Sequence, residues 1–235
     1  AGGSVQGKRL AVCGLAFKPN TDAMREAPCL DIHPPLKAEG AQIRAYDPAA
    51  MAMARVMMPD VTYCNDVFEA ASEADLLIVM TEWNQFRQLD LQQLRGWITL
   101  QEGAALTVPK LGEINGWLTL GRSTEFFAPN LTKIVQDLII GAGNTVFDAP
   151  KLVQVNNLII QNDGGPGRPF PALTTVRHGI TVGRAGGVFM PALTSVGGPI
   201  TLREHARLEA PALNYIGGYA DIDESATLVA PRFLS

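Results

Sequence analysis

The stretch Pro191–Leu202, P-A-L-T-S-V-G-G-P-I-T-L, recurs with variations through the second half of the chain. Each copy opens with a proline, and successive prolines are 20 or 21 residues apart. These prolines are Pro109, Pro129, Pro150, Pro171, Pro191, Pro211 and Pro231. Apolar residues stand at fixed distances after each proline, as Leu193, Val196 and Ile200 do here. A period near 20 residues is typical of a solenoid, in which each repeat buries its apolar face against its neighbours.

The local pattern favours a β-solenoid over a helical one. Ile200-Thr201-Leu202 alternates apolar and polar residues with the period of a strand that has one buried face. Gly-Gly and Asn-Asn pairs fit the tight corners between strands. We predict an all-β solenoid with parallel strands over residues 97–235, in which Arg168 interrupts one apolar column. Its rhythm resembles that of receptor L-domains and leucine-rich-repeat-like β-solenoids.

Residues 7–96 instead alternate short apolar runs with helical patterns. The predicted strands are Arg9–Phe17, Ala41–Tyr46, Val61–Cys64 and Asp75–Thr81. The predicted helices are Pro28–Glu39, which Pro34-Pro35 should kink or restart, Ala49–Met58, Asp66–Ala74 and Asn84–Leu94. This alternation implies a Rossmann-like α/β domain with a parallel sheet. Ligands of such sheets bind at the carboxyl ends of the strands.

Composition argues against several classes of function. The formal net charge is −4 and no basic run is present, so we expect no nucleic-acid partner. No long uninterrupted apolar window predicts a transmembrane helix. Cys13, Cys29 and Cys64 lack C-x-x-C spacing, which indicates reduced structural thiols and a cytoplasmic location. Residues 1–6 are expected to be a tag or linker remnant.

Three motifs lie at the ends of predicted strands. They are G-L-A-F-K-P-N-T-D-A-M-R-E at Gly14–Glu26, A-Y-D-P at Ala45–Pro48 and T-E-W-N-Q-F at Thr81–Phe86. In this order and spacing they closely resemble the C-terminal, UDP-binding domain of the UDP-glucose/GDP-mannose dehydrogenase family. The resemblance covers residues 7–96, roughly two fifths of the chain.

The resemblance implies roles for three side chains. It places Phe17 and Lys18 against the nucleotide-sugar, where an aromatic ring offers packing surface and lysine a point charge. It places Arg25 near the nicotinamide cofactor. Simpler readings remain: Phe17 ends a core strand, Lys18 is a solvated charge, and Arg25 pairs with Asp22 or Glu26.

The sequence also departs from the family. Ala23 and Ala27 stand where the family usually has Asp and Ser, and Trp83 and Phe86 are expected to pack rather than to bind. Three parts of the family are not found in this sequence. They are the N-terminal dinucleotide-binding half with its G-x-G-x-x-G motif, the nucleophilic cysteine, and the last strand with its D-G-R motif. Oxidation of an alcohol to an acid by this chemistry needs both NAD and a thiolate. We therefore expect no catalysis and no cofactor in this chain alone, although the resemblance implies NAD for the full-length family.

Two classes of function follow. The chain is either a UDP-sugar-binding module derived from an oxidoreductase, or a structural or interaction rod with the α/β piece as its N-terminal cap. Gly96–Pro109 aligns without a gap on Gly218–Pro231, so the repeat begins where the resemblance ends. We expect a truncated or chimeric chain whose uncapped last coil self-associates.

The solenoid offers few candidate site residues. His178 and His205 are isolated and do not predict a metal site. Tyr215 and Tyr219 either make contacts or partly close the last coil. Four arginines in neighbouring blocks form either a surface stripe or a solvated face. These are Arg177, Arg184, Arg203 and Arg207.

Overall fold

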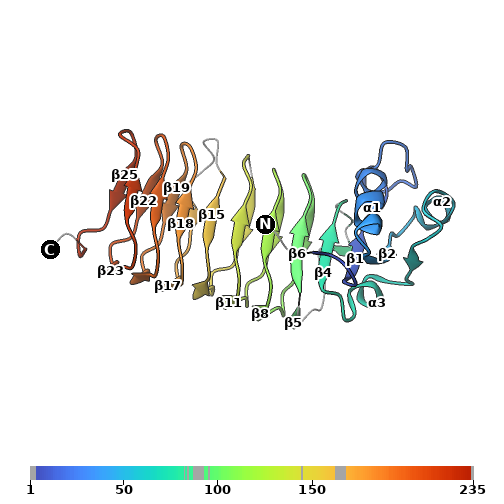
Figure 1. The fold of residues 1–235 in the computed structure, drawn as a ribbon, viewed down its shortest axis with the longest axis horizontal. Helices are drawn as coiled ribbons and strands as arrows, with labels where there is room; N and C mark the ends of the chain where they lie inside the picture. Colours follow the sequence, from blue (N-terminus) through green and yellow to red (C-terminus); the bar gives the residue numbers. More distant parts are fainter. Residues whose placement is uncertain are drawn as a thin grey trace.

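The computed structural model describes residues 4–81, 83, 85–86, 93–94, 96–143, 145–161 and 168–233. The molecule is elongated: an α/β segment lies at one end, and a stack of coils runs from it to the C-terminus (Figure 1). The two predicted fold classes are confirmed. A parallel α/β sheet is followed by a parallel β-solenoid.

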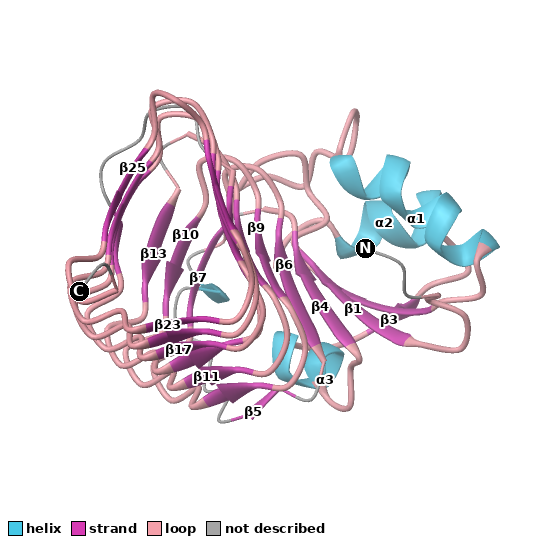
Figure 2. Ribbon diagram, turned by 60° about the vertical axis from the view of Figure 1, so that its left-hand side comes forward, coloured by secondary structure: helices cyan, strands magenta, loops and turns pink. Residues whose placement is uncertain are grey.

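The α/β segment contains a parallel sheet in the order β3-β2-β1-β4. Its strands are β1 (Arg9–Cys13), β2 (Gln42–Tyr46), β3 (Thr62–Tyr63) and β4 (Leu76–Val79). Its helices are α1 (Pro28–Ala38), α2 (Met51–Met57) and α3 (Val67–Ala71). Figure 2 shows α1 and α2 on one face of the sheet and α3 on the other. β1 and β4 are buried almost throughout, as expected for strands covered on both faces.

Two predicted elements differ in detail. β1 ends at Cys13 rather than at Phe17, because Gly14 adopts a φ of +82° and turns the chain out of the sheet. The helix does not restart at Pro34-Pro35, since α1 runs from Pro28 to Ala38 as one helix. Both prolines lie on its exposed side, where carbonyls that lose an N–H partner are accessible to water.

The solenoid has three faces, each built from one strand per coil (Figure 2). The first face consists of β6 (Trp97–Leu100), β9 (Leu118–Leu120), β12 (Leu138–Ile140), β15 (Leu158–Ile160), β18 (Ile180–Val182), β21 (Ile200–Leu202) and β24 (Ala220–Ile222). The second consists of β5 (Gln93–Leu94), β8 (Glu113–Ile114), β11 (Lys133–Ile134), β14 (Gln154–Val155), β17 (Thr175–Val176), β20 (Ser195–Val196) and β23 (Tyr215–Ile216).

The third face is divided into two sheets. The first of these sheets contains β7 (Ala105–Thr107), β10 (Glu125–Phe127) and β13 (Val146–Asp148). The second contains β16 (Arg168–Pro169), β19 (Gly187–Phe189), β22 (Arg207–Glu209) and β25 (Thr227–Val229). All recorded strand pairs are parallel, as the repeat predicts.

The apolar columns of the sequence form the core of the solenoid. Ile200 and Leu202 are fully buried, whereas Thr201 between them points outward and is only partly covered. Neighbouring coils stack in exact register, for example Ile180 on Ile200, so each column is continuous. Arg168 occupies one of these inner columns and is 7% exposed.

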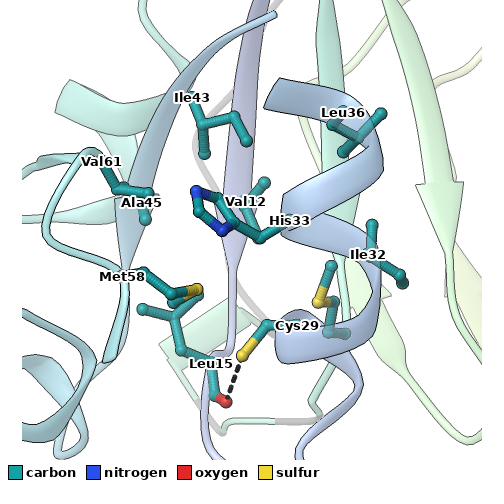
Figure 3. A pocket seen from close by; sticks show the side chains of 11 residues that line it. Val12, Leu15, Cys29, Ile32, His33, Leu36, Ile43, Ala45, Met58 and Val61 are labelled. Carbon is teal, nitrogen blue, oxygen red and sulfur yellow. Dashed lines mark hydrogen bonds between the residues drawn. The ribbon is translucent and has the colours of Figure 1, made fainter. Parts of the chain in front are cut away.

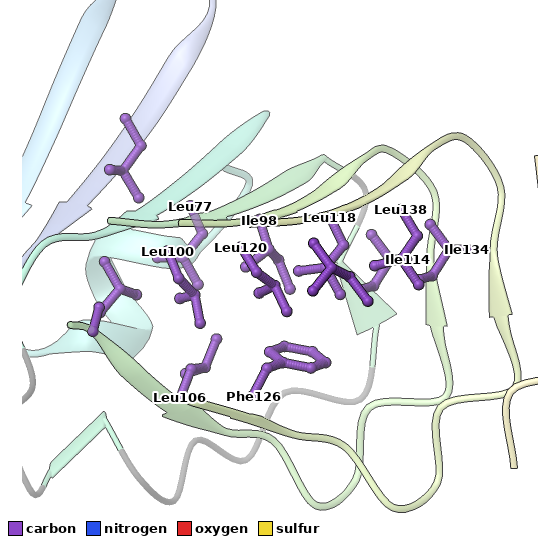
Figure 4. Close-up of a cluster of buried hydrophobic side chains, with 14 of the residues drawn as sticks. Leu77, Ile98, Leu100, Leu106, Ile114, Leu118, Leu120, Phe126, Ile134 and Leu138 are labelled. Atoms are coloured by element: carbon purple, nitrogen blue, oxygen red, sulfur yellow. The ribbon is translucent and has the colours of Figure 1, made fainter. Parts of the chain in front are cut away.

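The two parts of the molecule share one sheet. β4 pairs with β1 on one side and with β6 on the other, which gives an 11-stranded sheet from β3 to β24. The register sets Leu77 beside Ile98, and both side chains are fully buried. Figure 4 shows this inner row continuing into the coils. The α/β segment therefore covers the first coil directly.

The segment before this junction differs from the prediction. Gln93–Leu94 form β5, which pairs with β8, so the helix predicted over Asn84–Leu94 is wrong at its end. Asn84 and residues 87–92 lie outside the described residues. Pairing with the next coil extends Gln93–Leu94, overriding their local helical pattern.

Candidate functional site

The candidate site lies at the carboxyl ends of β1, β2 and β4. The chain leaves β1 at Gly14, where a Cβ atom would lie 2.7 Å from the Thr81 backbone nitrogen. The Thr81 hydroxyl donates to the Ala16 carbonyl at 2.5 Å. Gly14 N–H donates to the Tyr46 carbonyl at 3.0 Å. Close approach and a positive φ together require glycine at position 14.

Asp47, directly after β2, is a buried carboxylate that joins these strand ends. It is 1% exposed. Its Oδ2 accepts hydrogen bonds from the backbone N–H groups of Leu15 and Ala16 and from the Trp83 indole, at 2.7, 3.0 and 3.1 Å. Its Oδ1 accepts from the N–H groups of residues 49 and 50, which lead into α2. A buried carboxylate with this many donors is fully compensated for the loss of water.

Phe17 and Lys18 leave this buried region together. Ala16 is fully buried, whereas Phe17 is 52% exposed and Lys18 is exposed. The alternative in which Phe17 ends a core strand is therefore wrong. Within the described part of the chain, the Lys18 side chain makes no hydrogen bond or ion pair. The Phe17 N–H donates to the Ala23 carbonyl at 2.8 Å and closes the loop behind both side chains.

Arg25 is an exposed residue of the same loop. Its side chain is 94% exposed, and its Nε is 3.9 Å from a carboxylate oxygen of Glu26. An open hollow beside it is lined by Asp22, Ala23, Met24, Arg25, Met53 and Met57. None of the interactions among the described residues joins Arg25 to Phe17 or Lys18. Phe17 and Lys18 are thus adjacent exposed residues, and the charge recorded near Arg25 is that of Glu26.

The remaining motif residues pack, as predicted. Trp83 is 7% exposed and donates to Asp47, and Phe86 is fully buried. The ring of Phe86 stands edge-on to that of Tyr46, with 6.4 Å between centroids. Glu82 and Asn84 of the same motif lie outside the described residues.

The three thiols are all buried. Burial raises the pKa of the Cys29 thiol to about 12, and the charge of Asp47 adds to the rise. Burial also raises the pKa of Cys13 well above its usual range. Neither of these side chains is a thiolate at neutral pH, so neither has the character of a nucleophile.

An apolar pocket between α1 and the sheet is part of the core. Figure 3 shows Val12, Leu15, Ile32 and other apolar side chains around it. The Cys29 thiol, which also lines the pocket, donates a hydrogen bond to the Leu15 carbonyl at 3.1 Å. His33 borders the pocket, and its Nε2 is 3.1 Å from a carboxylate oxygen of Asp60. The Cys29 thiol is therefore hydrogen-bonded, whereas His33 Nε2 has a carboxylate nearby but no hydrogen bond among the described residues.

Three of the four candidate solenoid arginines form local ion pairs, and Arg177 lies beside the side-chain amide of Gln154 instead. Arg184 lies 3.0 Å from Glu204, Arg203 lies 3.0 Å from Asp221, and Arg207 lies 2.7 Å from Glu209. Each of these three charges is matched by an acid on the same or the next coil. The solvated face is therefore the reading that the structure favours. Tyr215 and Tyr219 are 56% and 69% exposed, so both are accessible for contacts.

The sequence shows Asp47 only as part of the A-Y-D-P motif and does not predict its hydrogen bonds to the segments after β1 and β4. Three of its hydrogen bonds come from residues 31 to 36 positions away in the sequence, so no local sequence pattern predicts them. An acidic residue directly after a β-strand, within A-Y-D-P, is the only signal.

Comparison with known proteins confirms the resemblance of the α/β segment. Residues 11–106 match the model of the UDP-glucose/GDP-mannose dehydrogenase family, UDP binding domain. A UDP-glucose 6-dehydrogenase of Rhizobium meliloti is 45% identical over 95 residues, which are 40% of this chain and 22% of that protein. UDP-glucose 6-dehydrogenase TuaD of Bacillus subtilis is 40% identical over 94 residues, which are 40% of this chain and 20% of that protein.

One solved structure aligns with part of this chain. It is a UDP-glucose dehydrogenase from the hyperthermophilic archaeon Pyrobaculum islandicum, with 34% identity and a TM-score of 0.39. The match covers 41% of this chain and 22% of that chain. This chain therefore spans about a fifth of the length of the relatives that it matches. No helix within the described ranges has the length and apolar character to cross a membrane.

Proposed function

We propose that the α/β segment is a UDP-sugar-binding module derived from an NAD-dependent UDP-glucose 6-dehydrogenase and fused to the solenoid. One observation carries the proposal: within a segment that matches a UDP binding domain, Phe17 and Lys18 project together from the carboxyl end of β1. This is the edge of a parallel sheet at which ligands bind.

Each side chain has a chemical role in this proposal. Half of the Phe17 side chain is accessible, so the ring offers a face on which a base or sugar packs. Lys18, whose ammonium group has no ion pair among the described residues, supplies a positive charge for a diphosphate. Arg25 is assigned to the nicotinamide cofactor, and its exposed position beside an open hollow leaves it accessible to a group from outside. NAD itself would bind to parts that the relatives contain and this chain does not match.

We further propose that the chain alone does not oxidise its ligand. The matched segment corresponds to about a fifth of the dehydrogenases. Cys13 and Cys29 are buried thiols with raised pKa values, so they do not replace a catalytic thiolate. Binding without turnover is the expected behaviour.

A second role is favoured by the shared sheet. Because β4 pairs with β6, the α/β segment acts as an N-terminal cap of a structural or interaction rod. In this alternative the rod contacts partners or a second copy of itself through the coil that contains β23, β24 and β25. That coil exposes Tyr215, Tyr219 and Ile222, which is 39% exposed. Both roles fit a cytoplasmic protein with reduced thiols.

Calorimetric titration with UDP-glucose and UDP tests the first role. We expect micromolar to low-millimolar binding by the wild-type chain and its loss in Lys18→Ala. Lys151→Ala serves as a control, because Lys151 is an exposed lysine of the solenoid that contacts Asn130. No binding heat for the wild type would reject the UDP-sugar module and leave the rod. Equal binding by Lys18→Ala and the wild type would remove Lys18 from the site.

A further inference from the structure

We propose that Asp47 is the positioning residue of this site: through the loop backbone, it holds Phe17 and Lys18 in their ligand-binding arrangement. The inference rests on the proposed UDP-sugar function and extends it to a residue that does not itself face the ligand. Asp47 is 1% exposed, so it acts through groups that it contacts.

The two carboxylate oxygens of Asp47 accept hydrogen bonds from different segments of the chain. Oδ1 accepts from Ala49 and Ala50 at 2.8 and 2.7 Å, which is enough to cap the turn that leads into α2. Oδ2 is not needed for capping. It accepts instead from Leu15 and Ala16 of the loop after β1 and from Trp83 after β4. A capping role alone leaves these three bonds unexplained.

The same short backbone segment is held from its other side. The Ala16 carbonyl accepts from the Thr81 hydroxyl, and the Leu15 carbonyl accepts from the Cys29 thiol. Every backbone polar group from the Gly14 nitrogen to the Ala16 carbonyl therefore has a partner from another segment. Such a segment has little freedom to rotate.

The hydrogen-bonded backbone segment Gly14–Ala16 ends directly before the two proposed ligand-binding residues. Ala16 is fully buried and Phe17 is 52% exposed, so the chain passes from fixed backbone to solvent within one residue. The Ala16–Phe17 peptide plane is held by the Thr81 hydroxyl and by the bond from Phe17 N–H to Ala23, and Asp47 holds the Leu15–Ala16 plane directly before it. Loss of the Oδ2 charge would release the Leu15–Ala16 plane without touching a ligand atom.

The test compares Asp47→Asn with Asp66→Asn. Asp66 is the control because its carboxylate also accepts from the backbone just before or within a helix, here from Glu69 N–H at 2.7 Å, and has no hydrogen bond to the loop after β1 among the described residues. We expect Asp47→Asn to weaken UDP binding roughly tenfold, because bonds to a charged acceptor are lost. Amide hydrogen exchange at Leu15 and Ala16 should quicken in this variant only. Asp66→Asn should bind UDP as the wild type does.

A double-mutant cycle separates positioning from general loosening of the fold. If Asp47 acts by orienting Phe17, then Asp47→Asn should weaken UDP binding by a smaller factor in a Phe17→Ala background than in the wild type. An equal loss in both backgrounds would overturn the inference, as would wild-type affinity in Asp47→Asn. Failure of the wild type to bind UDP would reject the proposed function and this inference together. That result differs from the two outcomes above, in which the wild type binds UDP and only the inference fails.

Trp83→Phe covers the case in which Asp47→Asn does not fold. This variant keeps an aromatic ring in the buried position and removes only the indole donor to Oδ2. We expect a smaller loss of UDP affinity, about threefold, together with faster exchange at Ala16. Unchanged affinity with faster exchange would overturn the positioning role.

Discussion

Leu77 of β4 and Ile98 of β6 are register partners in one parallel ladder, and neither side chain is exposed to solvent. Leu77 belongs to the α/β segment, whereas Ile98 begins the inner column of the solenoid that Leu118 continues. This pair joins the two parts through both backbone hydrogen bonds and core packing. It makes the parts one structural unit at this end of the rod.

Leu77→Ala should therefore destabilise both parts together. Removing a fully buried leucine side chain costs about 2–5 kcal/mol of unfolding free energy. We expect urea unfolding followed by helical circular dichroism and by fluorescence of the solenoid tryptophan Trp117 to shift to the same lower midpoint. Thr99→Ala, an outward-facing change on β6, is the control. A Trp117 transition left at its wild-type midpoint would contradict the shared core.

Gly103 tests the corner between the first and third faces. It has a φ of +74°, and a Cβ atom there would meet nothing within 4 Å, so Gly103→Ala probes backbone conformation alone. We expect a loss of about 1–2 kcal/mol of unfolding free energy. Gly112→Ala is the matched control, because that glycine also has open space but no positive φ. Equal midpoints for the two variants in urea would contradict this account.

Gly116 tests the stacked indoles on the outer side of the first face. The rings of Trp97 and Trp117 have centroids 4.6 Å apart and planes 21° from parallel. A Cβ atom at Gly116 would lie 1.9 Å from Cδ1 of Trp97. Gly116→Ala should therefore displace the Trp97 ring and cost about 1–3 kcal/mol. Near-ultraviolet circular dichroism should lose the signal of the coupled indoles, and an unchanged spectrum would disprove the contact.

The pKa of Cys29 predicts how stability changes in alkaline solution. Burial raises this pKa to about 12, whereas an unfolded cysteine ionises near its ordinary value of about 8.5. Between these values the unfolded chain loses a proton that the folded chain keeps, so stability should fall as pH rises through this window. Below it Cys29 should have no effect. Urea midpoints at several pH values measure the slope, which Cys29→Ala should reduce.

A thiol reagent gives an independent measurement of the same burial. Near pH 8 the folded chain should react slowly, because the reagent needs an accessible thiolate and Cys13, Cys29 and Cys64 are buried. All three should react once the chain is unfolded in urea. Rapid reaction of one equivalent in the native state would show an accessible thiol and contradict the packing described here.

The solenoid was predictable because its information is repeated. Val176, Val196 and Ile216 occupy the same position in successive coils. Because an apolar residue recurs at this position, a single deviation elsewhere does not hide the pattern. β5 was not predictable in this way, because its two residues become a strand only by pairing with β8. Arg168 broke the pattern in the sequence, yet it occupies the inner position.

The site was predictable only as far as its motifs reach. Phe17 and Lys18 follow from the motif after β1, and the structure sets both at one exposed strand end. The contribution of Asp47 depends on three strands ending at the same edge of the sheet, which is a property of the assembled fold. Local sequence patterns do not contain such long-range hydrogen bonds.

The recurring coil also bears on how such a chain changes in evolution. Each coil pairs only with the coil before it and the coil after it, as β18 does with β15 and β21. Duplication or loss of one repeat, about 20 residues, would thus change the length of the rod by one coil. The edge of the sheet near Gly14 and Asp47 would keep its geometry, so rod length and the site are free to vary independently.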